Sequence, residues 1–85
     1  MEQSEDRRQN FEITIEFNGS IKKIMVKPEE TTDGAEYFKC SDEGNLVSQI
    51  REEKDGKWEQ IWGELDMEMV ELIGSAINEH RIKSL

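Results

Sequence analysis

The chain is poor in several kinds of residue, and each shortage excludes a class of structure or function. Cys40 is the only cysteine among 85 residues, so no disulfide can form within the chain and no cysteine-based zinc cluster can be built. Apolar residues make up 34% of the chain and never form the long runs of a secretory signal or a membrane span. We therefore expect a cytoplasmic protein with no membrane partner.

Basic residues are also scarce. Eleven Lys and Arg residues stand against twenty Asp and Glu residues, which gives a formal net charge of −9. Binding a nucleic-acid backbone by charge requires a basic patch, so we expect no nucleic-acid partner. The same charge suggests one alternative function, an acidic decoy that mimics nucleic acid, although a solvated acidic surface explains the charge more simply.

Motifs for phosphate and metal ions are missing as well. The six glycines occur singly, and neither a dinucleotide-binding fingerprint nor a P-loop is present. Acidic residues gather at Asp42 and Glu43 and again at Glu29, Glu30 and Asp33, but neither stretch has the ligand spacing of a calcium loop. We expect no cofactor and no metal site.

A polar tail precedes one domain. Residues 1–10 contain no apolar run, and we expect them to be disordered or frayed, with a single domain over residues 11–85. That domain begins with a strand over residues 11–17, because four apolar residues alternate there with polar ones.

A tight hairpin should follow this strand at Asn18-Gly19, the preferred pair for a two-residue turn. The resulting register sets Ile13 opposite Ile24, whereas a three-residue loop would turn Ile21 and Met25 inward. We favour the two-residue turn. Pro28 should end the second strand, because proline cannot donate a hydrogen bond to the ladder.

Three further strands are expected over about residues 35–41, about residues 46–53 and around residues 58–62, with an acidic loop over residues 29–34 before them. A three-residue loop ending at Gly44 sets Cys40 opposite Leu46 and Phe38 opposite Ser48.

The turn at Asp55-Gly56 leaves the last register open. A two-residue turn pairs Ile50 with Ile61 and sends Trp58 and Trp62 to the uncovered face, and a longer loop pairs Ile50 with Trp62 and turns both tryptophans inward. In either register the two tryptophans share one face, as residues four apart in a strand do.

The C-terminal segment changes to helical spacing over about residues 67–82, with Asp66 as its N-cap. Gly74 lies on the apolar stripe, where a missing side chain lets the helix approach the sheet. The stripe consists of Leu65, Met69, Val70, Ile73, Ala76, Ile77 and His80. The sequence thus predicts an α+β fold, an antiparallel four- or five-stranded meander sheet with one C-terminal helix packed on one face.

Cys40 and His80 are the one nucleophile and base that the sequence offers. A lone strand cysteine is most often a small buried residue, and no oxyanion donor can be named, so we expect no enzyme. An alternative function is a small-molecule-binding or enzyme-accessory domain, with a pocket between sheet and helix near Cys40, Trp62 and His80.

Apolar residues remain for the sheet face that a single helix cannot cover. Contiguous exposed apolar surface usually marks an interaction site. We therefore interpret the protein as a protein–protein interaction module, a homodimer through this face or an edge strand, or a binder of another protein. The residues expected on the face are Ile21, Met25, Tyr37, Val47, Trp58 and Trp62.

Overall fold

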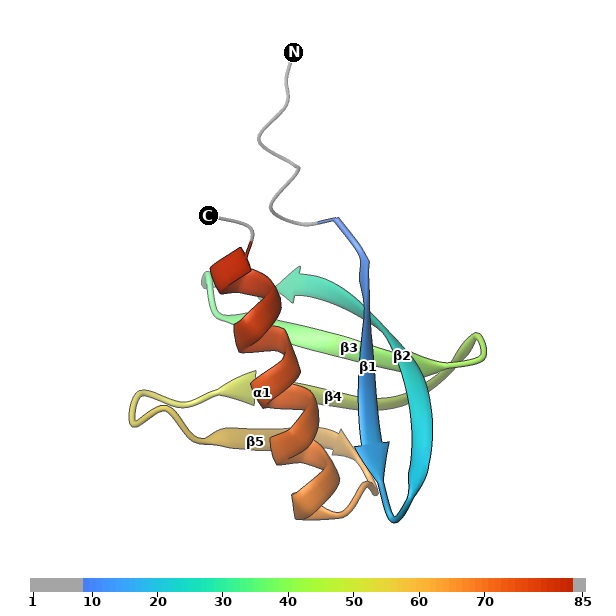
Figure 1. Cartoon of the computed structure of the whole chain (residues 1–85). Helices are drawn as coiled ribbons and strands as arrows, with labels where there is room; N and C mark the ends of the chain where they lie inside the picture. Colours follow the sequence, from blue (N-terminus) through green and yellow to red (C-terminus); the bar gives the residue numbers. More distant parts are fainter. Residues whose placement is uncertain (1–8, 84–85) are drawn as a thin grey trace.

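A computed structural model describes residues 9–83 of the chain and contains one five-stranded sheet and one helix (Figure 1). The elements are β1 (Phe11–Phe17), β2 (Ser20–Glu30), β3 (Glu36–Asp42), β4 (Asn45–Glu52), β5 (Trp58–Gly63) and α1 (Met67–Lys83). The strands pair in sequence order, each antiparallel to the next. This is the α+β meander with a C-terminal helix that the sequence predicts. Most of the predicted N-terminal tail lies outside the described residues.

The first hairpin has the predicted register. Asn18 and Gly19 both adopt positive φ angles, 54° and 78°, as a two-residue primed turn requires. Phe17 then pairs with Ser20 and Ile13 with Ile24. The prediction of a two-residue turn is confirmed.

Pro28 does not end the second strand, and that prediction is wrong. β2 continues to Glu30, and Pro28 pairs with Phe38 of β3. The last pair between β1 and β2 is Phe11–Val26, and hydrogen-bonding direction alternates along a strand. The nitrogen of Pro28 therefore points toward the β1 edge of β2. Since β1 has no residue paired with Pro28, the missing N–H costs no ladder hydrogen bond. As a result Glu29 and Glu30 belong to β2 and not to the expected acidic loop.

The register predicted between β3 and β4 is also wrong. The turn contains only two residues, Glu43 and Gly44, at φ 52° and 84°. A bulge then shifts the ladder, so that Cys40 pairs with Ser48 instead of Leu46, and Phe38 pairs with Ile50. Val47 is the extra residue on β4.

Neither register considered for β4 and β5 occurs. Hydrogen bonds from Glu53 N to Lys57 O (2.7 Å) and from Gly56 N to Glu53 O (2.9 Å) close a three-residue loop. Ile50 therefore pairs with Gln60, and a second bulge leaves Ile61 as the extra residue before Trp62 pairs with Gln49. This bulge puts Trp58 and Trp62 on opposite faces of the sheet, so the prediction that they share a face is wrong.

α1 covers one face of the sheet, running alongside β1 and crossing β4 and β5 (Figure 1). Its buried residues are Met69, Val70, Ile73, Gly74 and Ile77, which confirms the predicted stripe. They pack on the apolar residues of the strands, among them Ile13, Ile24, Val26, Phe38 and Ile50. The first turn starts at the expected N-cap, where Val70 N donates to Asp66 O at 3.0 Å.

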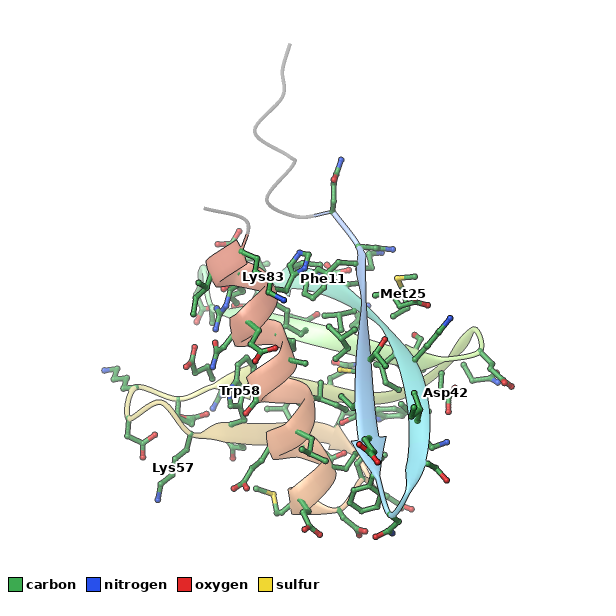
Figure 2. The ribbon with its side chains drawn as sticks, in the orientation of Figure 1. Phe11, Met25, Asp42, Lys57, Trp58 and Lys83 are labelled. Atoms are coloured by element: carbon green, nitrogen blue, oxygen red, sulfur yellow. The ribbon has the colours of Figure 1, made fainter. Side chains whose placement is uncertain are left out.

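Trp58 lies beside α1 in Figure 2 and is only 7% exposed. Its indole ring packs where a side chain of Gly74 would be, since a Cβ there would lie 2.4 Å from ring atoms of Trp58. Arg81 places its guanidinium 5.7 Å from the same ring and 5.6 Å from Phe38, and it donates to Glu52 at 2.8 Å. Cation–π and ionic contacts thus tie the end of the helix to the sheet.

Candidate interaction surface

The sheet face opposite α1, which we call the outer face, is formed by alternate residues of all five strands. Its side chains are Glu12, Thr14 and Glu16 of β1; Ile21, Lys23, Met25, Lys27 and Glu29 of β2; Tyr37, Lys39 and Ser41 of β3; Leu46, Gln49 and Arg51 of β4; and Glu59 and Trp62 of β5. Met25 illustrates this arrangement in Figure 2, where it lies across β1 from the helix.

Most apolar residues of the outer face are separated by polar ones. Met25 is 42% exposed and lies between Glu12 and Ser41 in the paired strands. Ile21 is 71% exposed and pairs with Glu16 at the end of the first hairpin. The contiguous apolar surface that the sequence predicts is therefore not formed across β1 and β2.

Apolar groups gather instead at the end of β5. An open hollow of about 450 Å³ is lined there by Val47, Trp62, Gly63, Glu64 and Leu65, and we call these five residues the Trp62 patch. Trp62 is 52% exposed, and the neighbouring residues Leu46 and Ile61 are 39% and 42% exposed. An exposed tryptophan beside aliphatic side chains provides an amphipathic contact surface of the kind enriched in interfaces.

The backbone is fitted closely at this site. Gly63 has φ 115°, and a Cβ at this position would lie 2.6 Å from the carbonyl oxygen of Val47. Only glycine suits such a conformation and such an approach. This close approach joins the two bulged segments, Val47 on β4 and Ile61 on β5. The bulge at Ile61 sets the position of Trp62 on the outer face.

A polar cluster beneath the patch fixes the connection from β5 to α1. The side-chain oxygen of Gln60 accepts from Leu65 N at 3.0 Å and lies 2.6 Å from Ser48 Oγ, and Gln60 Nε2 donates to Leu65 O at 3.0 Å. Ser48 Oγ also lies 3.1 Å from the carbonyl oxygen of Trp62. Ser48 is fully buried, so these bonds satisfy a polar group that would otherwise be costly to bury. The cluster holds the backbone on both sides of Trp62.

Lysines lie in the same cross-strand row as Trp62. The pairs Lys27–Lys39, Lys39–Gln49 and Gln49–Trp62 form this row across four strands. Two ammonium groups directly opposite each other on a sheet repel. Glu29 contacts both of them, with Oε2 3.3 Å from Lys27 Nζ and 3.9 Å from Lys39 Nζ.

Arg51 extends the basic region along β4. It donates from Nε to Glu53 at 2.8 Å and lies 3.4 Å from Glu59 through Nη2. The hydrogen bond and charge of Glu53 raise the pKa of the Arg51 guanidinium, with a further contribution from Glu59. Arg51 is thus a fixed positive charge on the outer face.

The structure brings together only some of the residues expected on the interaction face. Val47 and Trp62 meet in the Trp62 patch, while Ile21, Met25 and the partly buried Tyr37 lie elsewhere on the outer face. Trp58 does not lie on this face, because the three-residue loop pairs it with Glu52 on the helix side; the bulge at Ile61 then turns Trp62 outward.

The residues of the expected sheet–helix pocket are not brought together. Cys40 is fully buried on the helix side, whereas Trp62 lies on the outer face. The ring of His80 stacks on Phe11 at 3.8 Å, and Val26 stands between Phe11 and Cys40 in the paired strands. Burial raises the pKa of the Cys40 thiol to about 12, so at neutral pH it is a protonated apolar group.

Sequence reasoning did not include Gly63 or the paired lysines, and it assigned Leu65 to the helix stripe and not to the interaction face. An isolated glycine within a strand is a known sign of a bulge or a close backbone approach, and Trp62-Gly63 carries that sign. The Lys27–Lys39 pair depends on the β2–β3 register, and the loop between these strands is closed by Thr31, whose N donates to Ala35 O at 2.8 Å. Asp33-Gly34 is the turn signal that sequence reasoning did not use there: Gly34 has φ 91° and its N donates to Thr31 O at 3.0 Å, as Gly56 N donates to Glu53 O in the β4–β5 loop.

Comparison with known proteins gives no relative: no family model, no curated protein and no solved structure matches the chain. Within residues 9–83, no three His, Cys, Asp or Glu side chains gather as ligands for a metal ion. The same residues include no helix with the length and apolar character needed to cross a membrane.

Proposed function

We propose that this protein is a non-enzymatic protein–protein interaction module whose contact surface is the outer face, centred on the Trp62 patch. The observation that carries the proposal is the outward position of Trp62, 52% exposed next to a hollow. Tryptophan is usually well buried, and it is also the residue most enriched in interface hot spots. Bulges commonly re-aim a side chain, and here two adjacent bulges support this one.

The edge strands favour contact through the face instead of sheet extension. β1 pairing with its own copy about Thr14 would set Glu12 opposite Glu16, and like charges in opposite positions destabilise a ladder. β5 carries the bulge at Ile61, which disrupts the regular row of backbone groups that an added strand needs. Both edges thus carry features that discourage strand addition.

The environment of the one cysteine does not favour cysteine catalysis. Cys40 is buried and its raised pKa keeps the thiol protonated, which removes the activation that cysteine catalysis needs. The homodimer expected from the sequence stays a prediction. The test must distinguish two possible partners of the outer face, a second copy of this chain and a different protein.

The test compares the wild-type chain with Trp62→Ala, and with Ile82→Ala as a matched control, because Ile82 is 67% exposed on the helix. Self-association is measured by sedimentation equilibrium, and partner binding by quantitative capture from the source cell extract. We expect Trp62→Ala to weaken association at least tenfold, as a hot-spot residue does, and Ile82→Ala to leave it within twofold. Association that is unchanged by Trp62→Ala would contradict the proposal.

A further inference from the structure

We infer that the occupant of the outer face is an acidic segment of another protein that carries an apolar side chain for the Trp62 patch, and not a second copy of this chain. This inference rests on the proposed function, because it names the partner of the same surface. It is carried by the distribution of charge over the five strands.

Charges on the outer face are sorted by strand. The inner strands β2, β3 and β4 present Lys23, Lys27, Lys39 and Arg51 on this face, with Glu29 as their one carboxylate. The edge strands present the other carboxylates, Glu12 and Glu16 on β1 and Glu59 on β5. A chain with a net charge of −9 thus has more cations than carboxylates along the middle of one face, although Arg51 is already paired with Glu53 and Glu59.

This pattern does not complement itself. In a two-fold, face-to-face dimer centred on β3, with its axis parallel or perpendicular to the strands, inner strands lie over inner strands. Lys39, on the central strand β3, would lie over the same strand of its copy, and the edge carboxylates would lie over edge carboxylates. Like charges facing each other across an interface oppose binding by several kcal/mol in the most buried cases, so charge selects against a second copy.

An acidic segment satisfies both parts of the surface. Lys27, exposed over 56% of its side chain, and Lys39, exposed over 36%, share a single carboxylate, so the pair can accept a further anionic partner. The row from Lys27 to Trp62 crosses three interstrand spacings of about 4.8 Å, or about 14 Å. An extended segment covers that distance in about four residues. The fitting segment has one apolar residue for the hollow and carboxylates about four residues away.

Nucleic acid is the less suitable polyanion. A single strand carries a phosphate at every nucleotide, and its path across the inner strands would pass the carboxylates of β1 and β5. A peptide can place its charges only over the lysines. Short peptides also avoid much of the long-range repulsion from the −9 net charge.

The experiment titrates the intact chain with a seven-residue peptide, leucine followed by Ser-Gly-Ser and three aspartates, acetylated and amidated. Tryptophan fluorescence reports binding, since Trp62 is exposed and Trp58 is buried. Matched probes replace the three aspartates by asparagine or the leucine by serine. The protein variants are Lys27→Gln with Lys39→Gln, and, as a control of equal charge change, Lys54→Gln with Lys57→Gln in the exposed β4–β5 loop.

We expect the acidic peptide to bind at least fivefold more tightly than the asparagine and serine probes. Removing Lys27 and Lys39 should weaken it about tenfold, and removing Lys54 and Lys57 less than twofold. Equal binding of the asparagine probe, or no binding of the acidic peptide, would overturn the inference. Tighter binding of oligothymidylate of equal charge would overturn it in favour of nucleic acid.

Sedimentation separates this inference from the proposed function. A wild-type dimer that Trp62→Ala dissociates would overturn the acidic partner and leave the outer face as an interaction surface. Self-association that occurs without the peptide and is unchanged by Trp62→Ala would contradict both the acidic partner and the proposed function.

Discussion

The contact between Gly74 and Trp58 sets how closely the helix approaches the sheet. A Cβ on Gly74 would lie within 2.4–2.5 Å of three atoms of the indole ring, far inside van der Waals contact. The ring cannot easily move away, because it lies 5.7 Å from Phe38 and beneath Arg81. Glycine in a helix costs about 1 kcal/mol relative to alanine, and this close packing offsets that cost.

Gly74→Ala should therefore destabilise the protein in spite of its better helix propensity. We expect the free energy of unfolding to fall by about 2 kcal/mol, the range observed for overpacked cores. Urea denaturation followed by far-UV circular dichroism measures it. The control is Ser75→Ala on the exposed side of the same helix, which should be neutral or slightly stabilising. A Gly74→Ala protein as stable as the control would contradict this packing.

Cys40 should be unreactive in the folded protein. Its thiol is buried with a pKa of about 12, so the reactive thiolate is scarce at pH 8 and access is blocked. We expect iodoacetamide to modify it at least a hundredfold more slowly in buffer than in 8 M urea, as measured by intact mass over time. Rapid modification of the folded chain would contradict its burial.

The raised pKa of Cys40 also makes stability depend on pH. Between the ordinary thiol value of 9.0 and about 12 the unfolded chain binds fewer protons than the folded one. The contribution of Cys40 to the free energy of unfolding is therefore constant below pH 9, and it decreases as the pH rises from 9 toward 12. Cys40→Ala should remove this contribution to the slope, which denaturation at pH 8, 9 and 10 can measure.

At the scale of secondary-structure elements, only the first of the three predicted turns gives the expected register, and neither bulge is predicted from the sequence. Asn18-Gly19 specifies a two-residue turn, and the whole register of β1 and β2 follows from it. The helix was equally clear, since burial repeats along it with helical spacing. The bulges at Val47 and Ile61 leave no comparable pattern, and each one reverses the face of every residue beyond it.

This difference explains what was missed at the candidate site. The outward position of Trp62 depends on the bulge at Ile61, and alternation alone put both tryptophans on one face. Val47 and Trp62 could be named from the sequence, but their meeting in one hollow needed both shifts in register. The sheet, its order and its helix were thus predictable, and the fine placement of side chains at the end of β5 was not.

Gln60 is the residue through which β5 supports the Trp62 patch. Gln60→Ala would leave Leu65 N and Leu65 O without their partner and Ser48 with a poorer one. We expect a loss of about 2 kcal/mol of unfolding free energy and faster hydrogen exchange at Leu65. Gln49→Ala, on the outer face beside Trp62, should change stability by less than about 0.5 kcal/mol. Equal losses of unfolding free energy in the two variants would show that the hydrogen bonds of Gln60 do not stabilise the connection from β5 to α1.

At the scale of the whole molecule, acidic charge and binding surface lie apart. Exposed carboxylates such as Glu68, Glu71 and Glu79 lie on the helix, while the cations of the inner strands lie on the opposite face of the sheet. Under the proposed function, the acidic residues of the helix lie away from the contact surface, which leaves the outer face to the partner. The decoy function considered from the net charge of −9 stays a prediction.

The most direct measurement is a two-dimensional ¹H–¹⁵N NMR titration of the intact chain with the leucine–triaspartate peptide. The account predicts shifts at the Trp62 indole N–H, at Lys39 and at Gln49, with none at the Trp58 indole N–H or at Ile77 under the helix. Shifts centred on α1, or a spectrum unchanged at millimolar peptide, would contradict the assignment of the outer face as a surface for an acidic partner.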